Sequence, residues 1–320
     1  MVDLIRANDL EGVYAIIPTP AREGADHWSA TDTIDLAESE RLVNQLIADG
    51  ASGLIALGTT GECATLTTAE YRSFVDVVLS TVAGRIPTFM GATALGTHEI
   101  VERLRFVRDQ GATGTLLGLP MWQPLTEDMA VRFFADMSEA CPDLAIMVYM
   151  NLRAFHFEFP ISFWERVAAE APTVVAAKYA RGPYKETIEA TGGRINLLPV
   201  DMAVLPMSQL APENVTACWS TASSMGPQPV TALMKAIAAK DMERAKEIDA
   251  DIKWANETFI PSDPVEWNHF NLQLEKLRMG AAGYCKPGPI RPPYHLVPDH
   301  LRASAAESGQ RWAKLVEKYS

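Results

Sequence analysis

Short apolar runs alternate with helical patterns in this chain as far as Trp219. Eight of these runs predict strands, at 13–17, 53–57, 87–91, 114–119, 144–149, 174–178, 195–200 and 215–219. Strands that alternate with helices are typical of a parallel α/β sheet, and eight such units close a barrel. The sequence therefore predicts the α/β class, as a (β/α)8 TIM barrel.

The segments between these runs carry apolar residues at helical spacing. The expected helices are 33–49, 68–82, 97–110, 127–139 and 161–169. A doubly wound open sheet is the alternative fold, but no GxGxxG follows an early strand, so its usual phosphate-binding loop is missing.

Beyond Trp219 the pattern is helical, with expected helices at 227–239, 242–258, 265–282 and 300–319. These helices are more than a barrel needs for closure. We therefore expect a barrel over residues 1–240 and a helical extension over residues 241–320 that packs on it. The proline-rich segment Lys286–Pro293 separates the last two helices.

Charge and composition exclude several classes of protein. The net charge is −12 and Lys and Arg are not clustered, which argues against a nucleic-acid partner. No apolar stretch reaches the roughly 18 residues that span a bilayer, and the N-terminus lacks the pattern of a signal peptide. The 4 cysteines are widely spaced and the 6 histidines form no HxH or HExxH pattern, so no metal site or disulfide framework is predicted. A cytoplasmic protein with reduced thiols fits best.

Lys178 closes the apolar run 173–177, which reads as a buried parallel strand between Pro172 and Gly182. Burying an ammonium is costly and favours the neutral amine, which can attack a carbonyl. Such a lysine is a candidate for an imine (Schiff base). Taken alone, it is more often a strand-end lysine whose stem packs while its ammonium reaches water.

Other expected strand ends also carry unusual polar groups, and in a barrel the carboxyl ends of the strands form the active site. The second strand leads into Gly58-Thr59-Thr60-Gly61-Glu62, whose amides and hydroxyls could bind a carboxylate, and the fifth ends at Tyr149. A tight turn and a packed tyrosine are the ordinary explanations. Together with Lys178 as nucleophile and Tyr149 as proton carrier, however, these groups predict a site for a 2-oxo acid.

These residues resemble the class I pyruvate-dependent aldolases of the dihydrodipicolinate synthase and N-acetylneuraminate lyase type. The match of the 58–62 motif, Tyr149 and Lys178 runs from about Gly12 to Met225. Within that family, the chain is similar over nearly its whole length to the hydratase-aldolases of polycyclic aromatic hydrocarbon degradation. The segments that carry this likeness are Ile17–Pro20, Gly61–Thr67, Leu119–Trp122, Tyr149–Asn151, Ala177–Tyr179 and Gly288–Tyr294.

The resemblance implies a pyruvoyl group bound as an imine to Lys178. Its carboxylate would be held at Gly58, Thr59 and Thr60, with Tyr149 shuttling protons and Asn151 among the binding residues. Water would add across a conjugated double bond, and a retro-aldol step would release an aromatic aldehyde and pyruvate. The imine is the electron sink for both steps, so no metal or cofactor is expected. The resemblance also implies a homotetramer.

The chain departs from the synthase pattern at two loops. The tyrosine that synthases supply to a neighbouring subunit is replaced in Met121-Trp122-Gln123, and Tyr-Asn-x-Pro is altered to Tyr149-Met150-Asn151-Leu152. These changes put the synthase proton relay in doubt. We expect Trp122 and Trp219 to flank an aromatic ring instead, although large aromatics near strand ends are often core residues.

Three further side chains are expected to choose the ring substituent. Asn271, which matches an asparagine of the hydratase-aldolase branch, would bind the ortho substituent or position the water; the alternative is a solvated helix residue. Arg181, three residues beyond Lys178, would pair with an ortho carboxylate, with Arg153 as second candidate. Either arginine could simply be exposed.

The favoured substrate is trans-2'-carboxybenzalpyruvate, which would give 2-carboxybenzaldehyde and pyruvate. The alternative is trans-o-hydroxybenzylidenepyruvate, giving salicylaldehyde and pyruvate. A condensing enzyme of the dihydrodipicolinate synthase type and a sugar-acid lyase also stay open, although the tryptophans argue against a polyol. The alternative that is not an enzyme is a protein with the same barrel that binds or senses a 2-oxo acid without catalysis.

Overall fold

The computed structural model describes residues 4–320. Its eight strands form one sheet in the order β7-β6-β5-β4-β3-β2-β1-β8. The strands are β1 (Gly12–Ile16), β2 (Gly53–Ala56), β3 (Thr88–Gly91), β4 (Gly114–Leu117), β5 (Ala145–Tyr149), β6 (Val174–Lys178), β7 (Asn196–Leu198) and β8 (Ala217–Ser220). Eight parallel strands with helices between them are a (β/α)8 barrel. The fold class predicted from the sequence is confirmed.

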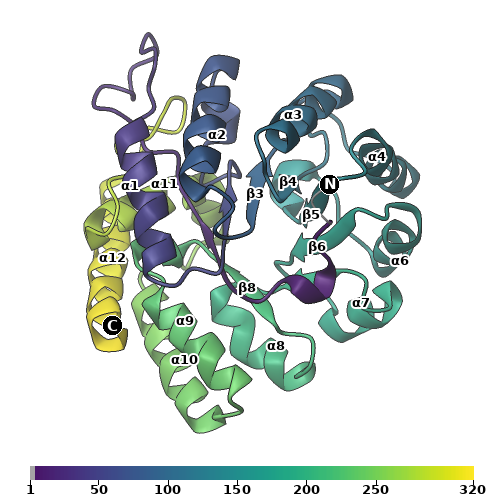
Figure 1. Ribbon diagram of the computed structural model, residues 1–320. Coiled ribbons are helices and arrows are strands. Elements are labelled where there is room, and N and C mark those ends of the chain that lie inside the picture. Colours follow the sequence, from purple (N-terminus) through teal and green to yellow (C-terminus); the bar gives the residue numbers. More distant parts are fainter. Residues whose placement is uncertain (1–3) are drawn as a thin grey trace. The chain divides into compact units, whose positions relative to one another are not determined.

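The helices connect these strands and continue past β8 (Figure 1). They are α1 (Leu36–Ala48), α2 (Thr68–Val82), α3 (Thr97–Asp109), α4 (Glu127–Ala140), α5 (Leu152–Phe155), α6 (Ile161–Glu170), α7 (Tyr184–Thr191), α8 (Val204–Leu210), α9 (Gln228–Ala238), α10 (Met242–Asn256), α11 (Pro264–Ala282) and α12 (Asp299–Tyr319). Short 3-10 turns are η1 (Ala7–Asp9), η2 (Cys63–Thr65), η3 (Asp201–Ala203) and η4 (Ala222–Met225).

The described chain divides into two compact units. Unit 1 holds residues 4–12 and 87–219, with β3 to β7, most of β8 and helices α3 to α8. Unit 2 holds residues 13–86 and 220–320, with β1, β2, α1, α2 and α9 to α12. The helices expected after residue 240 are present as α10, α11 and α12, while the boundary at residue 240 stays a prediction.

In unit 1, paired strands bring polar groups to one end of the sheet. Residues 145–149 of β5 are all buried, as are the first four residues of β6. The register pairs Tyr149 with Lys178, and Lys178 with Leu198 of β7. Since parallel strands end at the same edge, Tyr149 and Lys178 stand side by side at the carboxyl ends of β5 and β6.

In unit 2, side-chain caps fix where the helices begin. The Asp35 side chain accepts from the Glu38 amide at α1, and Thr67 and Glu70 form a capping box at α2. Burial raises the pKa of Glu70, but hydrogen bonds from Thr33 and Thr67 outweigh it and hold that pKa at about 2. At the other end of the unit, α10 packs against α9 and α12 (Figure 1).

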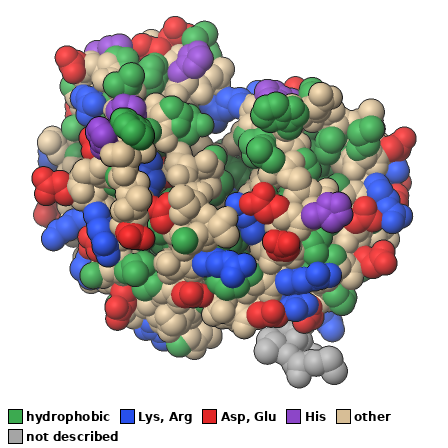
Figure 2. All heavy atoms as spheres, turned by 90° about the horizontal axis from the view of Figure 1, so that it is seen from above, with side chains coloured by type: hydrophobic (Ala, Val, Ile, Leu, Met, Phe, Trp, Pro, Cys, Tyr) green, Lys and Arg blue, Asp and Glu red, His purple; other side chains and the backbone are tan. Residues whose placement is uncertain are grey.

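Figure 2 shows acidic and basic side chains interspersed on one face of the molecule. None of the helices within residues 4–320 combines the length and the apolar character needed to cross a bilayer. None of the four cysteines, all in the described part of the chain, is joined in a disulfide.

Candidate active site

Lys178 is the last residue of β6, and its side chain is half-buried. The strand before it is buried, as the sequence predicts. Its ammonium nitrogen Nζ lies 3.4 Å from the centroid of the Trp219 ring and 5.0 Å from that of Tyr149. An aromatic face attracts a cation through the ring quadrupole. These two rings therefore stabilise positive charge at the lysine nitrogen, whether it is an ammonium or an iminium.

Trp219 is held in place by the residues that directly follow β6 and β7. Its indole Nε1 donates to the carbonyl of Tyr179 at 3.1 Å, and its backbone amide donates to Pro199 at 3.0 Å. The side chain is half-buried, so the alternative that it belongs wholly to the core does not apply. The residue expected to flank the substrate ring lies directly against the lysine nitrogen.

Tyr149 ends β5, and its hydroxyl accepts a hydrogen bond from the amide of Asn151 at 3.2 Å. The Asn151 carbonyl Oδ1 in turn accepts from the Ala154 amide at 3.2 Å and caps α5. The Tyr149 ring packs edge-on against Phe155, with centroids 5.3 Å apart. Asn151 therefore couples the start of α5 to the orientation of the tyrosine hydroxyl.

Gly118 makes room for this arrangement. A Cβ at that position would lie 2.0 Å from the Phe155 ring, which is 2 % exposed. The sequence alone predicts no role for Gly118 or Phe155, although Gly118 directly precedes the characteristic segment Leu119–Trp122. That glycine is the one sign in the sequence of a close approach by another side chain.

Arg153 and Arg181 both lie at the surface of unit 1, and the Arg153 guanidinium is partly covered there. Burial lowers the pKa of the Arg153 guanidinium; Tyr149 opposes this shift, and the positive charge of Arg181 adds to it. These effects put Arg153 within electrostatic reach of both residues. One cationic side chain, Arg153, therefore lies near Tyr149, and a second, Arg181, lies near Arg153.

Trp122 follows β4, and its side chain is 79 % exposed. That exposure excludes the core alternative for this tryptophan. Its contact with a substrate ring stays a prediction.

In unit 2, the motif 58–62 forms a tight turn after β2. The amides of Glu62 and Cys63 donate to the carbonyls of Thr59 and Gly58, at 2.9 and 3.3 Å. Gly61 has no room for a side chain, because a Cβ there would lie 2.7 Å from the Leu57 nitrogen.

The turn presents the two threonines differently: Thr59 is half-buried, whereas Thr60 is 8 % exposed. Gly58 is buried in the same turn, and Asn271 is half-buried on α11 of the same unit. The structure thus groups Lys178, Tyr149, Asn151 and Trp219 in unit 1, and Gly58, Thr59, Thr60 and Asn271 in unit 2. That both groups serve one site stays the prediction of the sequence.

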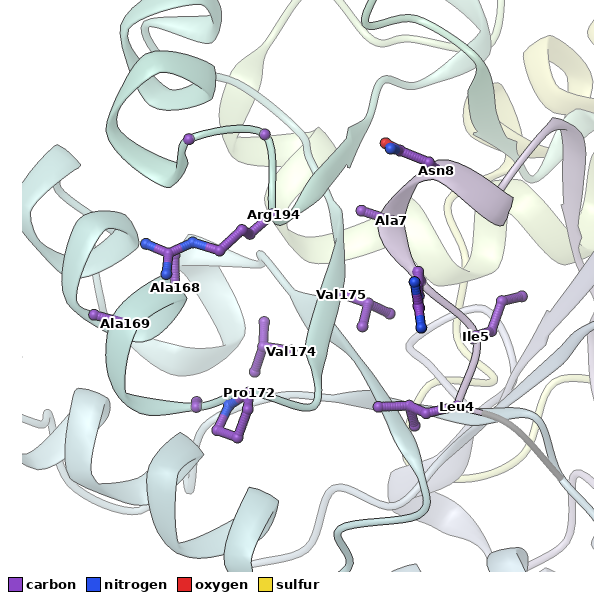
Figure 3. A pocket seen from close by; sticks show the side chains of 14 residues that line it. Leu4, Ile5, Ala7, Asn8, Ala168, Ala169, Pro172, Val174, Val175 and Arg194 are labelled. Carbon is purple, nitrogen blue, oxygen red and sulfur yellow. The ribbon is translucent and has the colours of Figure 1, made fainter. Parts of the chain in front are cut away.

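A hollow of about 720 Å3 in unit 1 lies near the opposite end of β6 (Figure 3). Its lining includes Val174 and Val175 from the start of the strand, Ala7, and the arginines Arg6 and Arg194. It contains no lysine or other nucleophile, so it does not serve the chemistry expected of Lys178. Within the described residues, no group of three or more His, Cys, Asp or Glu side chains could hold a metal ion.

Comparison with known proteins places the chain in a family. Residues 26–294 match the dihydrodipicolinate synthetase family. The trans-o-hydroxybenzylidenepyruvate hydratase-aldolase of Pseudomonas aeruginosa is 41% identical, over 99% of this chain and 96% of that protein. The trans-2'-carboxybenzalpyruvate hydratase-aldolase of Nocardioides sp. (strain KP7) is 36% identical, over 98% of this chain and 96% of that protein.

A solved structure described as PhdJ bound to substrate intermediate superimposes with a TM-score of 0.96 at 37% identity. The match covers 99% of this chain and 100% of that one. The family match and the names of these nearly full-length relatives confirm the family and the enzyme class predicted from the sequence. The chain belongs to the dihydrodipicolinate synthetase family, as an enzyme of the carbon–carbon lyase class.

Proposed function

We propose that this chain is a hydratase-aldolase that works through an imine at Lys178. Its substrate is an ortho-substituted benzylidenepyruvate, and its products are an aromatic aldehyde and pyruvate. The observation that carries the proposal is the position of Lys178 Nζ at the carboxyl end of β6, 3.4 Å from the Trp219 ring and beside Tyr149. The names of the relatives support the same reaction class.

The reaction begins when the neutral amine of Lys178 attacks the ketone carbon of the substrate and water leaves. The protonated imine is a cation at the nitrogen, where the rings of Trp219 and Tyr149 stabilise it. The substrate carboxylate lies on the amides and hydroxyls of Thr59 and Thr60.

Water then adds to the carbon that bears the aromatic ring, and the electron pair of the double bond moves toward the iminium. Protonation of the resulting enamine gives the hydrated imine. Removal of the new hydroxyl proton breaks the carbon–carbon bond, the aldehyde leaves, and the electron pair again forms an enamine. Protonation of this enamine restores an imine, and its hydrolysis releases pyruvate and frees Lys178. Tyr149, oriented by Asn151, carries protons in these steps. The imine between Lys178 and the substrate supplies the electron sink, so the reaction as proposed needs no cofactor.

We favour trans-2'-carboxybenzalpyruvate as the substrate. Arg153 lies near Tyr149 and near Arg181, and an arginine pairs well with a carboxylate. The second candidate is trans-o-hydroxybenzylidenepyruvate, which the higher identity of the Pseudomonas relative supports, at 41% against 36%. In both cases Trp122, Trp219 and Asn271 surround the ring.

The test is aldehyde release from each of the two substrates, followed by absorbance. We expect turnover of at least one, faster for the carboxylated compound, and no turnover by a Lys178→Met variant. Imine formation without aldehyde release from either compound would favour a 2-oxo-acid sensor. Condensation of pyruvate with an aldehyde but no cleavage would favour the synthase alternative.

The assembly and the location follow from the family resemblance and from the cysteine pattern. We propose a homotetramer that works in the cytoplasm. Light scattering on the purified chain tests the first statement, because a mass other than four subunits contradicts it.

A further inference from the structure

Three charged side chains are buried together behind the turn at residues 58–62. The side chains of Glu62, Lys276 and Arg291 are 0%, 1% and 3% exposed, and we call them the Glu62 cluster. Glu62 Oε2 lies 2.6 Å from Lys276 Nζ and 2.7 Å from the Arg291 guanidinium. Glu62 Oε1 accepts from the Arg291 amide at 2.8 Å. Both carboxylate oxygens of Glu62 therefore accept hydrogen bonds from the other two members of the cluster.

The cluster joins parts of unit 2 that are far apart in sequence. Glu62 follows β2, Lys276 lies on α11, and Arg291 follows that helix. Lys276 also donates to the Pro289 carbonyl at 2.8 Å, and Arg291 donates to the Thr19 carbonyl at 3.1 Å. These extra bonds hold the two cations in place independently of Glu62.

The segment that carries Arg291 is itself locked against the residues after β1. The Ala21 amide donates to the Pro287 carbonyl at 3.0 Å. At Gly288, with φ at +69°, a Cβ would lie 1.9 Å from the Ala21 carbonyl oxygen, so the two backbones touch. These backbone contacts fix the position of the segment from which the Arg291 side chain reaches Glu62.

Glu62 also closes the turn through its own backbone. Its φ of 51° and ψ of 31° are left-handed, which a residue with a side chain adopts only where its surroundings enforce it. Its amide donates to the Thr59 carbonyl, and the Thr19 hydroxyl donates to the Gly61 carbonyl at 2.7 Å. The buried carboxylate is therefore the anchor of a strained turn that contains Thr59 and Thr60.

The charges in the cluster depend on one another. Burial lowers the pKa of Lys276, and the Glu62 carboxylate opposes that shift. Without Glu62, two buried cations would lose the carboxylate that balances them, and such an uncompensated charge draws in water or moves the side chain. Replacing any one of the three charged side chains is therefore expected to displace the turn at residues 58–62.

We propose that Lys276 and Arg291 are positioning residues for the 2-oxo acid. By holding Glu62 they fix the turn that presents Thr59 and Thr60 to the substrate carboxylate. Helix α11 and the segment 288–291 thereby set the affinity for the pyruvoyl group without touching it. This inference rests on the proposed function, in which Thr59 and Thr60 bind that carboxylate.

The test is a titration with pyruvate, read by borohydride trapping of the imine. Glu62→Gln and Lys276→Met should each raise the half-saturating pyruvate concentration about 10- to 100-fold, because small displacements of positioning groups have effects of that size. Trapping at saturating pyruvate should change much less. The double variant should be no worse than the worse single variant, since both act through one contact.

Leu274→Ala is the matched control. Leu274 is 0% exposed on the same helix and belongs to a core cluster with Phe259, Leu301 and Ala305, none of which is a member of the Glu62 cluster. This change should lower the melting temperature and leave the half-saturating concentration as in the wild type. A rise equal to that of Lys276→Met would mean that general loosening of α11 is the cause, and would overturn the proposal.

Failure of the inference differs from failure of the proposed function. If the wild type is not trapped at all, the proposed function fails. If the wild type is trapped and Thr59→Val weakens trapping, but Glu62→Gln and Lys276→Met do not, only the positioning role is overturned. Should Lys276→Met not fold, Arg291→Lys replaces it, because it keeps the charge and loses the fork of N–H donors that reaches Glu62 and Thr33; the same rise is expected.

Discussion

Asn151 offers a test of how the tyrosine is oriented, because two of the contacts of its side chain can be separated by substitution. Its Oδ1 caps α5 at the Ala154 amide, and its amide donates to the Tyr149 hydroxyl. Serine is as good a helix cap as asparagine but is too short to reach the hydroxyl, whereas alanine makes neither contact. Comparing Asn151→Ser with Asn151→Ala therefore separates the cap from the orientation of Tyr149.

The magnitudes follow from the two contacts. Loss of the cap should lower the free energy of unfolding by about 1 kcal/mol in Asn151→Ala and by much less in Asn151→Ser. Loss of the hydrogen bond to Tyr149 should cost about 0.5–1.5 kcal/mol in the proton-transfer step, which is about 2- to 13-fold in kcat for both variants. Stability is measured by urea unfolding and kcat by aldehyde release.

Two results would refute this reasoning. If Asn151→Ser keeps the full kcat, the amide does not orient the tyrosine. If kcat falls only in Asn151→Ala and in step with its stability, the effect belongs to the helix cap. Tyr149→Phe supplies the reference, with an expected loss of roughly 10²- to 10⁴-fold in kcat for a missing acid–base group.

Three further predictions concern charge. Replacing Trp219 by Leu removes the ring at 3.4 Å from Lys178 Nζ, and a half-buried cation–π contact of about 1–2 kcal/mol should slow aldehyde release by about 5- to 30-fold; Phe should restore part of the rate, and equal rates for Leu and Phe would contradict the role of the ring. Arg153→Ala and Arg181→Ala should slow turnover of the carboxylated substrate more than that of the hydroxylated one, and equal losses would remove the arginines as partners of the ortho carboxylate. Glu70 should make the fold sensitive to acid: its pKa of about 2 lies below the usual value of 4.5 for a glutamate, so its stabilisation is complete above pH 4.5 and is lost as the pH falls toward 2. Urea unfolding across that range should show a shallower pH dependence for Glu70→Gln, and an unchanged slope would show that Glu70 does not contribute.

The periodic part of the fold could be predicted from the sequence, because buried parallel strands are continuous apolar runs. The range expected for β6 agrees with the structure, and the other strands differ by one or two residues at one or both ends. Helices α5, α7 and α8 were not expected. The shortest of them, α5, depends on the Asn151 cap rather than on an apolar stripe, and caps without a following periodic pattern are weak signals.

At the candidate site, sequence reasoning identified residue types but not their contacts. It proposed Trp219 as part of a ring-binding wall, which stays a prediction, and it did not anticipate that the indole ring packs against the lysine nitrogen. It quoted the segments containing Glu62 and Arg291 without giving either a role, because the partners are separated by 229 positions. Contacts at such separations come from tertiary packing, which periodicity does not encode.

The most direct test of the account is the site of the covalent adduct. The protein is incubated with pyruvate and borohydride, digested, and mapped by mass spectrometry. The account predicts an irreversible adduct of one pyruvate, less one water and plus two hydrogens, on the peptide that contains Lys178 and on no other. An adduct on a different lysine, or no adduct while aldehyde is still released, would contradict it.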